Sequence, residues 1–244
     1  MEQLSVSAIK QQFEQLVVGP NTVATLSGDF DRAEDLPRFQ SILEKLPEGP
    51  FDPKQLAFDG PAQVGTHEVS LPREQAVVFQ AYPDAGLIQD DSIVGDVLRE
   101  LFNEMSGNLF QQVREKRSLA YFIGANRLLS QQYGMFYFYS GTHPDTYLEV
   151  LEQIDAEVER IQNGQLDQQE LHRCQVRLKA AKRQRFQDTA SRAQEAALNM
   201  LYGLPNNYWN TYDERLEKVD CAALQSFAQK YFRPEQKVIL IVKP

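Results

Sequence analysis

The chain lacks the short motifs that identify many enzymes on their own. It contains no HExxH or inverted HxxEH zinc pattern, no phosphate-binding P-loop, no GxGxxG and no GxSxG. Its three histidines, His67, His143 and His172, lie far apart, and no two of them stand within four residues. We therefore assign no metal ligand to this chain and expect no independent catalysis.

Cysteine and positive charge are also scarce. The two cysteines, Cys174 and Cys221, lie on predicted helices without CxxC spacing, so we interpret both as structural thiols. With 25 basic against 34 acidic residues the net charge is −9, which argues against non-specific nucleic-acid binding and favours neutral or cationic partners. The basic residues that cluster between positions 173 and 185 lack stacking aromatics, and we interpret them as a solvated helix face.

Long hydrophobic runs are missing as well. No apolar run approaches the roughly 20 residues of a bilayer span, and the N-terminal residues lack the basic and apolar regions of a signal peptide. We expect a soluble protein, located in the cytoplasm or, if a leader has been removed, in the periplasm. At 244 residues and 42% hydrophobic, the chain can bury a full core, and we expect residues 1–244 to form a single domain.

Hydrophobic periodicity predicts an α+β fold with a mainly antiparallel sheet packed by helices. Helices are expected over residues 5–17, 32–46, 91–105 and 147–161, and over most of the region from there to a final strand at 238–242. Earlier strands are expected at residues 23–26, 63–71, 75–82, 121–123 and 133–139. A turn at Pro72 would join the second and third of these strands as neighbours, and the last two would form an aromatic hairpin. Thr142 and Asp145 resemble a capping box ahead of the helix at 147–161.

A helix, a proline turn and a strand occur near both ends of the chain. At an offset of 214 positions, five residues of the first unit fall on similar residues of the second: Phe13, Val17, Val18, Pro20 and Leu26 on Phe227, Tyr231, Phe232, Pro234 and Leu240. Either two related units bracket the domain, or a common pattern recurs by chance. Residues 1–28 form the leading helix and strand, which a preceding domain could share.

The most informative run lies between Ser106 and Tyr121. It reads S-G-N-L-F-Q-Q-V-R-E-K-R-S-L-A-Y and places Arg114 and Tyr121 seven residues apart at a predicted helix-to-strand junction. A permanent cation and a phenol could therefore point to the same side of a sheet. Taken alone, the pair would be a surface charge and a half-buried aromatic residue.

The part of this run from Leu109 to Tyr121 resembles the R-E-K-R-G-L-A-Y signature in the C-terminal domains of the M16 family of zinc peptidases, which includes insulinase, pitrilysin and mitochondrial processing peptidase. Ser118 replaces the usual glycine, and it would be strained if that position requires a positive φ. Residues 27–31, S-G-D-F-D, resemble the family's G-D-x-D at the end of a strand. The order of elements is similar over essentially the whole chain, up to Y-F-R-P at 231–234.

The resemblance implies the LuxS/MPP-like metallohydrolase fold and a division of labour. In this family one half carries HxxEH and zinc, whereas the other half supplies an arginine and a tyrosine. By resemblance, Arg114 binds substrate carbonyls, and Tyr121 contacts substrate and stabilises the oxyanion in trans to the zinc. The chain would hold no cofactor, would be inactive alone, and would form part of a zinc metalloendopeptidase only with an HxxEH-bearing M16 domain, fused or separate. Peptide substrate could add as a strand to a sheet edge.

Two other roles stay open. The chain could be a non-proteolytic structural or assembly subunit, like the respiratory-complex core proteins that share this fold, or a free-standing peptide-binding module. A partner with HxxEH favours the peptidase, a partner with a degenerate motif favours the structural role, and peptide binding by the isolated chain favours the module.

Overall fold

A computed structural model describes residues 4–50, 58 and 60–244. Their contacts fall into two compact units. Unit 1 contains the described residues of Met1–Ala57 together with Gln184–Trp209, and unit 2 contains those of Phe58–Arg183 and Asn210–Pro244.

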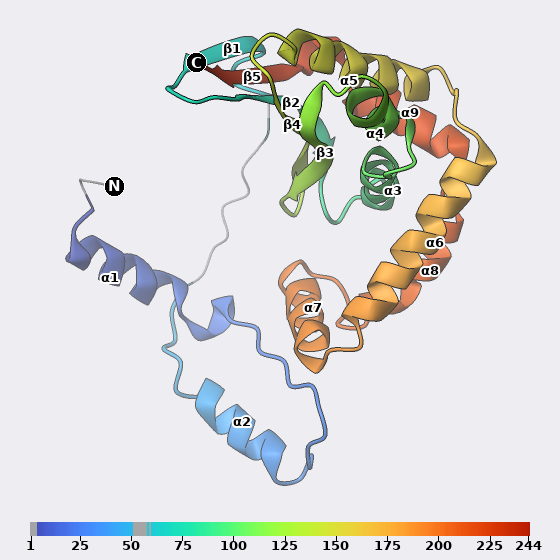
Figure 1. The fold of residues 1–244 in the computed structure, drawn as a ribbon. Helices are drawn as coiled ribbons and strands as arrows, with labels where there is room; N and C mark the ends of the chain where they lie inside the picture. Colours follow the sequence, from blue (N-terminus) through green and yellow to red (C-terminus); the bar gives the residue numbers. More distant parts are fainter. Residues whose placement is uncertain (1–3, 51–57, 59) are drawn as a thin grey trace. The chain divides into compact units, whose positions relative to one another are not determined.

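Unit 2 contains a five-stranded sheet (Figure 1). Its strands are β1 (Gly65–Ser70), β2 (Ala76–Ala85), β3 (Ala120–Leu129), β4 (Tyr133–Thr142) and β5 (Val238–Lys243). The spatial order is β1-β5-β2-β4-β3, and all neighbours are antiparallel except β1 and β5, which are parallel. The predicted α+β class, the mainly antiparallel sheet and the aromatic hairpin of β3 and β4 are confirmed.

Two strand predictions are wrong. β1 and β2 are not neighbours, because β5 lies between them. Residues 238–242 read V-I-L-I-V, and a continuous apolar run favours an interior strand, whereas β1 reads G-T-H-E-V-S and is mostly polar and exposed, as an edge strand can be. Residues 23–26 form no strand and have no strand partner within the described part of the chain, although their backbone leaves the preceding turn extended.

Helices cover one face of the sheet. α3 (Ser92–Phe102), α5 (Tyr147–Gln162) and α9 (Cys221–Tyr231) all contact β2. Phe136 and Phe138 of β4 point to this face and pack edge-on against Phe102 of α3, with ring centroids 5.8 and 4.8 Å away. Tyr137, between them, points to the other face, as alternation along a strand requires. The core of unit 2 thus lies between the sheet and these three helices.

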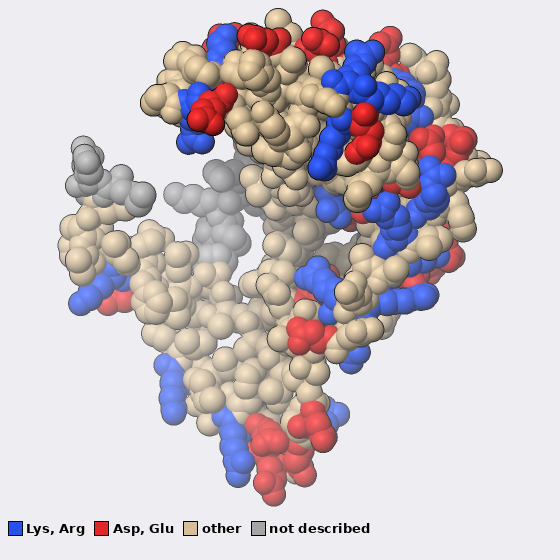
Figure 2. Space-filling model, viewed as in Figure 1, with Lys and Arg blue, Asp and Glu red and all other residues tan. Residues whose placement is uncertain are grey.

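Unit 2 also contains α4 (Asn108–Phe110), α8 (Tyr212–Glu217) and most of α6 (Gln168–Arg185), and a short 3₁₀ turn, η4 (Pro234–Gln236), precedes β5. The basic cluster lies on α6, and its side chains form ion pairs with other elements, for example Arg173 with Glu104 at 2.9 Å and Lys182 with Asp213 at 3.3 Å. Figure 2 shows basic and acidic side chains interleaved over α6 and α8. The cluster is therefore locally neutralised as well as partly solvated.

The predicted capping box at α5 is wrong. Thr142 is the last residue of β4, five positions ahead of the first residue of α5, and its hydroxyl donates to the Leu119 carbonyl. The residue that precedes α5 is Thr146, which makes no side-chain capping bond.

Unit 1 is helical. It contains α1 (Val6–Leu16), a 3₁₀ turn η1 (Gly19–Asn21), α2 (Asp35–Leu43) and α7 (Thr189–Leu201), and a second 3₁₀ turn, η3 (Tyr208–Thr211), crosses into unit 2. Val18 is buried, and the Thr25 hydroxyl donates to the Ala193 carbonyl of α7 at 2.6 Å. α1 buries none of its residues. In the described part of the chain, no helix combines the length and the apolar character that crossing a membrane requires.

Candidate functional site

A short helix anchored in the core presents Arg114. α4 continues directly into a wider, π-helical turn, η2 (Gln111–Lys116). Leu109 and Val113 are 2% and 0% exposed and fix one side of this helix in the core, while the Asn108 amide donates to Glu157 at 2.6 Å. Because Val113 points inward, Arg114 projects from the outer side and is exposed. Such widened turns are frequent at functional sites.

Ser118 ends this helix in the left-handed conformation, with φ +50°. Its N–H donates to the Arg114 carbonyl at 3.2 Å, and the Leu119 N–H donates to the Val113 carbonyl at 2.8 Å. Glycine is the usual residue at this position of a helix C-terminus, because a β carbon is unfavourable there. The structure therefore meets the condition under which serine is strained, and the two hydrogen bonds hold it in that conformation.

A β-bulge at the start of β3 presents Tyr121. Ala120 pairs with Thr142 and Phe122 with Gly141, so Tyr121 is an extra residue on the β3 side. A bulge interrupts the alternation of faces and redirects a side chain, and here both Tyr121 and Phe122 are exposed, at 59% and 43%.

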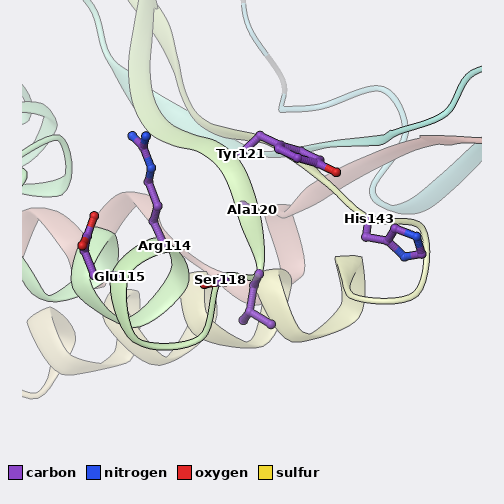
Figure 3. Close-up of a pocket in the computed structure, with 7 residues that line it drawn as sticks. Arg114, Glu115, Ser118, Ala120, Tyr121 and His143 are labelled. Atoms are coloured by element: carbon purple, nitrogen blue, oxygen red, sulfur yellow. The ribbon is translucent and has the colours of Figure 1, made fainter.

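Both predicted site residues line one cavity of about 490 Å³, together with Glu115, Ser118, Leu119, Ala120 and His143 (Figure 3). In this view the Arg114 side chain extends from η2 alongside β3. The ring of Tyr121 points away from Arg114, towards the side on which His143 is drawn. The two groups therefore lie at different ends of the cavity, and a ligand that contacts both would span it.

Two side chains of the cavity, Arg114 and Tyr121, have free hydrogen-bond donors within the described part of the chain. Among the described residues, neither the Arg114 guanidinium nor the Tyr121 hydroxyl has a hydrogen-bond or ion-pair partner, and Arg114 lies over the Phe110 ring with its Cζ 5.2 Å from the centroid. A cation–π contact positions a guanidinium without using its N–H donors. Both groups can therefore donate to a ligand.

The sequence does not single out Glu115 or His143 as members of the site. His143 is 61% exposed at its side chain, and its Nδ1 accepts a hydrogen bond from the Asp145 N–H at 3.3 Å. His143 directly follows β4, and β4 pairs with β3, the strand of Tyr121. The predicted hairpin was therefore the one sequence feature that could have placed His143 near Tyr121. His67 on β1 and His172 on α6 do not line this cavity.

Neither the Cys174 thiol nor a metal-ligating cluster offers a second centre among the described residues. Cys174 lies in the core, where burial raises the pKa of its thiol to about 12. Within residues 4–50, 58 and 60–244, no group of three or more His, Cys, Asp or Glu side chains is placed to hold a metal ion.

A family model described as "Peptidase M16 inactive domain" matches residues 3–178, well over half of the chain. The chain therefore belongs to the M16 peptidase family, as an inactive domain, and the predicted family is confirmed. No curated protein matches the chain.

Solved structures show the same fold at low sequence identity. A protease from Helicobacter pylori has a TM-score of 0.87 at 19% identity, over 100% of this chain and 60% of its own. The peptidase M16 inactive domain from Pseudomonas fluorescens has a TM-score of 0.86 at 19% identity, over 99% of this chain and 58% of its own. A chain of Complex III2 from Candida albicans has a TM-score of 0.75 at 15% identity, over 88% of this chain and 53% of its own. This chain thus spans about 60% or less of the length of each.

Proposed function

We propose that this chain is the substrate-binding, non-zinc half of an M16 zinc metallopeptidase, which hydrolyses peptide bonds. The observation that carries the proposal is the cavity in which Arg114 and Tyr121, the two residues of the family-like motif, both have free donors. The described residues do not fit a metal ion, so zinc is expected on an HxxEH-bearing partner half. The chain alone is inactive under this proposal.

Arg114 binds the backbone of the peptide substrate. A guanidinium presents several N–H donors in a fixed plane, which suits the carbonyl oxygens of an extended peptide. Because no described acidic side chain pairs with Arg114, substrate binding does not require breaking an ion pair.

Tyr121 stabilises the oxyanion that develops when the peptide carbonyl is attacked. A phenol O–H is a suitable donor for this role if it is fixed before the reaction, and the bulge in β3 fixes its backbone. The chemistry that attacks the carbonyl comes from the partner half, and this chain contributes hydrogen-bond donation and orientation.

The edge of β3 next to Tyr121 holds the substrate strand. The sheet order leaves β1 and β3 as edges, and only β3 carries a cavity residue. At Ala125 both backbone groups of β3 are already hydrogen-bonded to the Asn103 side-chain amide, which donates to the Ala125 carbonyl at 2.8 Å and accepts from the Ala125 N–H at 2.9 Å. A peptide added by β-augmentation at the Tyr121 end of β3 would therefore not extend past Ala125.

The test is peptide cleavage by the chain assembled with its HxxEH-bearing half. We expect no cleavage by the chain alone, and for Arg114→Ala a fall in kcat/KM of about tenfold or more, since a charged hydrogen bond is lost. Arg117→Ala is the matched control, because Arg117 is exposed one turn away and does not line the cavity. Equal activity of the two variants would contradict the role of Arg114.

One observation favours a second candidate, a structural or assembly subunit without proteolysis. The chain shares its fold with a chain of Complex III2 from Candida albicans. This role predicts an assembled protein whose partner lacks HxxEH and which cleaves no peptide. A free-standing peptide-binding module, by contrast, predicts that the isolated chain binds peptides in titration calorimetry. The net charge of −9 makes cationic peptides the first to try.

A further inference from the structure

Two segments near the two ends of the chain have the same local structure. α1 and α9 both have 11 residues, and Val6–Leu16 corresponds to Cys221–Tyr231 at an offset of 215 positions. The helices begin in the same way, because Ser5 and Asp220 each accept a hydrogen bond from the backbone N–H three residues later. The 3₁₀ turns Gly19–Asn21 and Pro234–Gln236 follow at the same offset.

The offset of 215 corrects the sequence comparison by one position. It places the apolar residues of α1 on the residues of α9 that face or flank the core: Val6 on Cys221, Ile9 on Leu224, Phe13 on Ala228 and Leu16 on Tyr231. Caps, helix length and turn agree together at this offset, which a chance match of a common pattern does not explain.

The two helices differ in what covers them. In α9, Leu224 and Ala228 are both 0% exposed. In α1, the corresponding Ile9 and Phe13 are 57% and 62% exposed, and no residue of the helix is buried. An amphipathic helix packs its apolar side against a core. α1 therefore has the pattern of a packed helix without the core that the pattern requires.

The segments that follow the turns differ in the same way. After η4 the chain enters β5, which pairs in parallel with β1 and antiparallel with β2. After η1 the chain is also extended, with φ −116° and ψ 128° at Thr22, but residues 23–27 have no strand partner among the described residues. Ile241 of β5 is 1% exposed, whereas its counterpart Leu26 is 40% exposed.

We infer that residues 6–27 are the closing helix–strand unit of a second sheet, which belongs to the zinc-bearing M16 half. α1 packs on the helical face of that half. Residues 23–27 fill a gap in its sheet between one parallel and one antiparallel strand, as β5 does in unit 2. This inference rests on the proposed function for the identity of the partner.

Three observations favour the zinc-bearing half, and not a second copy of this chain, as the partner of residues 6–27. The unit that residues 6–27 resemble completes an M16 sheet within this very chain. α1 belongs to unit 1, whereas the sheet belongs to unit 2 and already has its own closing strand. The Helicobacter pylori protease has this fold over only 60% of its length, so a protein of that size has room for a second sheet.

Photo-crosslinking in the native assembly tests the inference. The full chain, tagged after Pro244, is expressed in its source cells with p-benzoylphenylalanine in place of Phe13, or in place of Gln11 on the opposite side of α1. We expect at least about tenfold more crosslinking from position 13, because only the apolar side of an amphipathic helix meets a core. The crosslinked peptides should lie in the sheet domain of the HxxEH-bearing half. Crosslinks confined to this chain, or equal crosslinking from both positions, would overturn the inference.

Hydrogen exchange of residues 23–27 provides the second measurement. Paired strand amides exchange far more slowly than unpaired ones, so we expect at least about tenfold slower exchange in the assembly than in the isolated chain. Unchanged exchange would show that the segment completes no sheet.

Two variants distinguish docking from folding. Ile9→Asp should weaken assembly at least about tenfold, because it would bury a carboxylate, whereas Gln11→Asp should leave assembly within about twofold. Both side chains are exposed in the isolated chain, so neither variant should change its melting temperature.

The outcomes also separate this inference from the proposed function. Crosslinks from position 13 into an M16 sheet without HxxEH, in an assembly that cleaves no peptide, would support the sheet completion and contradict the peptidase. Peptide cleavage that depends on Tyr121, without crosslinks from position 13, would support the peptidase and contradict the sheet completion.

Discussion

Replacing Ser118 with glycine should stabilise the protein. Ser118 has φ +50°, where an L-residue with a β carbon costs about 1–2 kcal/mol. Glycine removes that strain but adds freedom to the unfolded chain, which costs about 0.4–1 kcal/mol. The net gain should be about 0.5–1 kcal/mol, and for a protein of this size it should raise Tm by about 1–4 °C.

Differential scanning calorimetry measures this gain, and Ser118→Ala provides the control. Alanine keeps the β carbon and therefore the strain, so its stability should stay within about 0.5 kcal/mol of the original. Peptide cleavage by the assembled protein should be unchanged in Ser118→Gly, because backbone hydrogen bonds hold the segment between Arg114 and Tyr121. A lower Tm for Ser118→Gly, or an equal rise in both variants, would refute the strain argument.

Two further predictions concern the supports of the fold. Burial raises the pKa of Glu104, but hydrogen bonds from Arg173 and Ser106 outweigh burial and leave the pKa below its usual value. The ionised carboxylate therefore stabilises the fold above the unfolded-state pKa, and this stabilisation disappears as the pH falls through the lowered folded-state pKa. In urea denaturation at neutral pH, Glu104→Gln should have a free energy of unfolding about 1–3 kcal/mol below that of the original protein. This difference should close in acid, and a difference that stays constant with pH would contradict the role given to the Glu104 carboxylate. In Gly95→Ala the new β carbon would clash with the Arg127 guanidinium, which four hydrogen bonds fix in place. We expect the free energy of unfolding to fall by about 1–3 kcal/mol in the same assay, and an unchanged midpoint would show that Arg127 can move aside.

Local patterns in the sequence predict the elements that depend on local physics. The spacing of apolar residues predicts α3 and α5, and the alternation of Phe136, Tyr137 and Phe138 predicts a strand with one buried face. The motif between Arg114 and Tyr121 predicts that both residues meet at a helix-to-strand junction, and the structure places them in one cavity.

Long-range pairing is what the sequence does not reveal. The position of β5 between β1 and β2 joins segments about 155–175 residues apart, which no local pattern encodes. Residues 23–26 have the composition of a strand, but a strand forms only where a partner offers backbone groups. His143 reaches the cavity because β4 ends beside the bulge in β3, and a bulge depends on how two strands pair.

The most direct test of the central claim is the effect of Tyr121→Phe on peptide cleavage by the chain assembled with its HxxEH-bearing half. Removal of one oxyanion donor should lower kcat by about 10²-fold or more. Tyr137→Phe is the control, because it removes a phenol hydroxyl from β4 outside the cavity, and it should keep activity within about twofold. If Tyr121→Phe also stays within about twofold, Tyr121 does not stabilise the oxyanion and the account of this site is wrong.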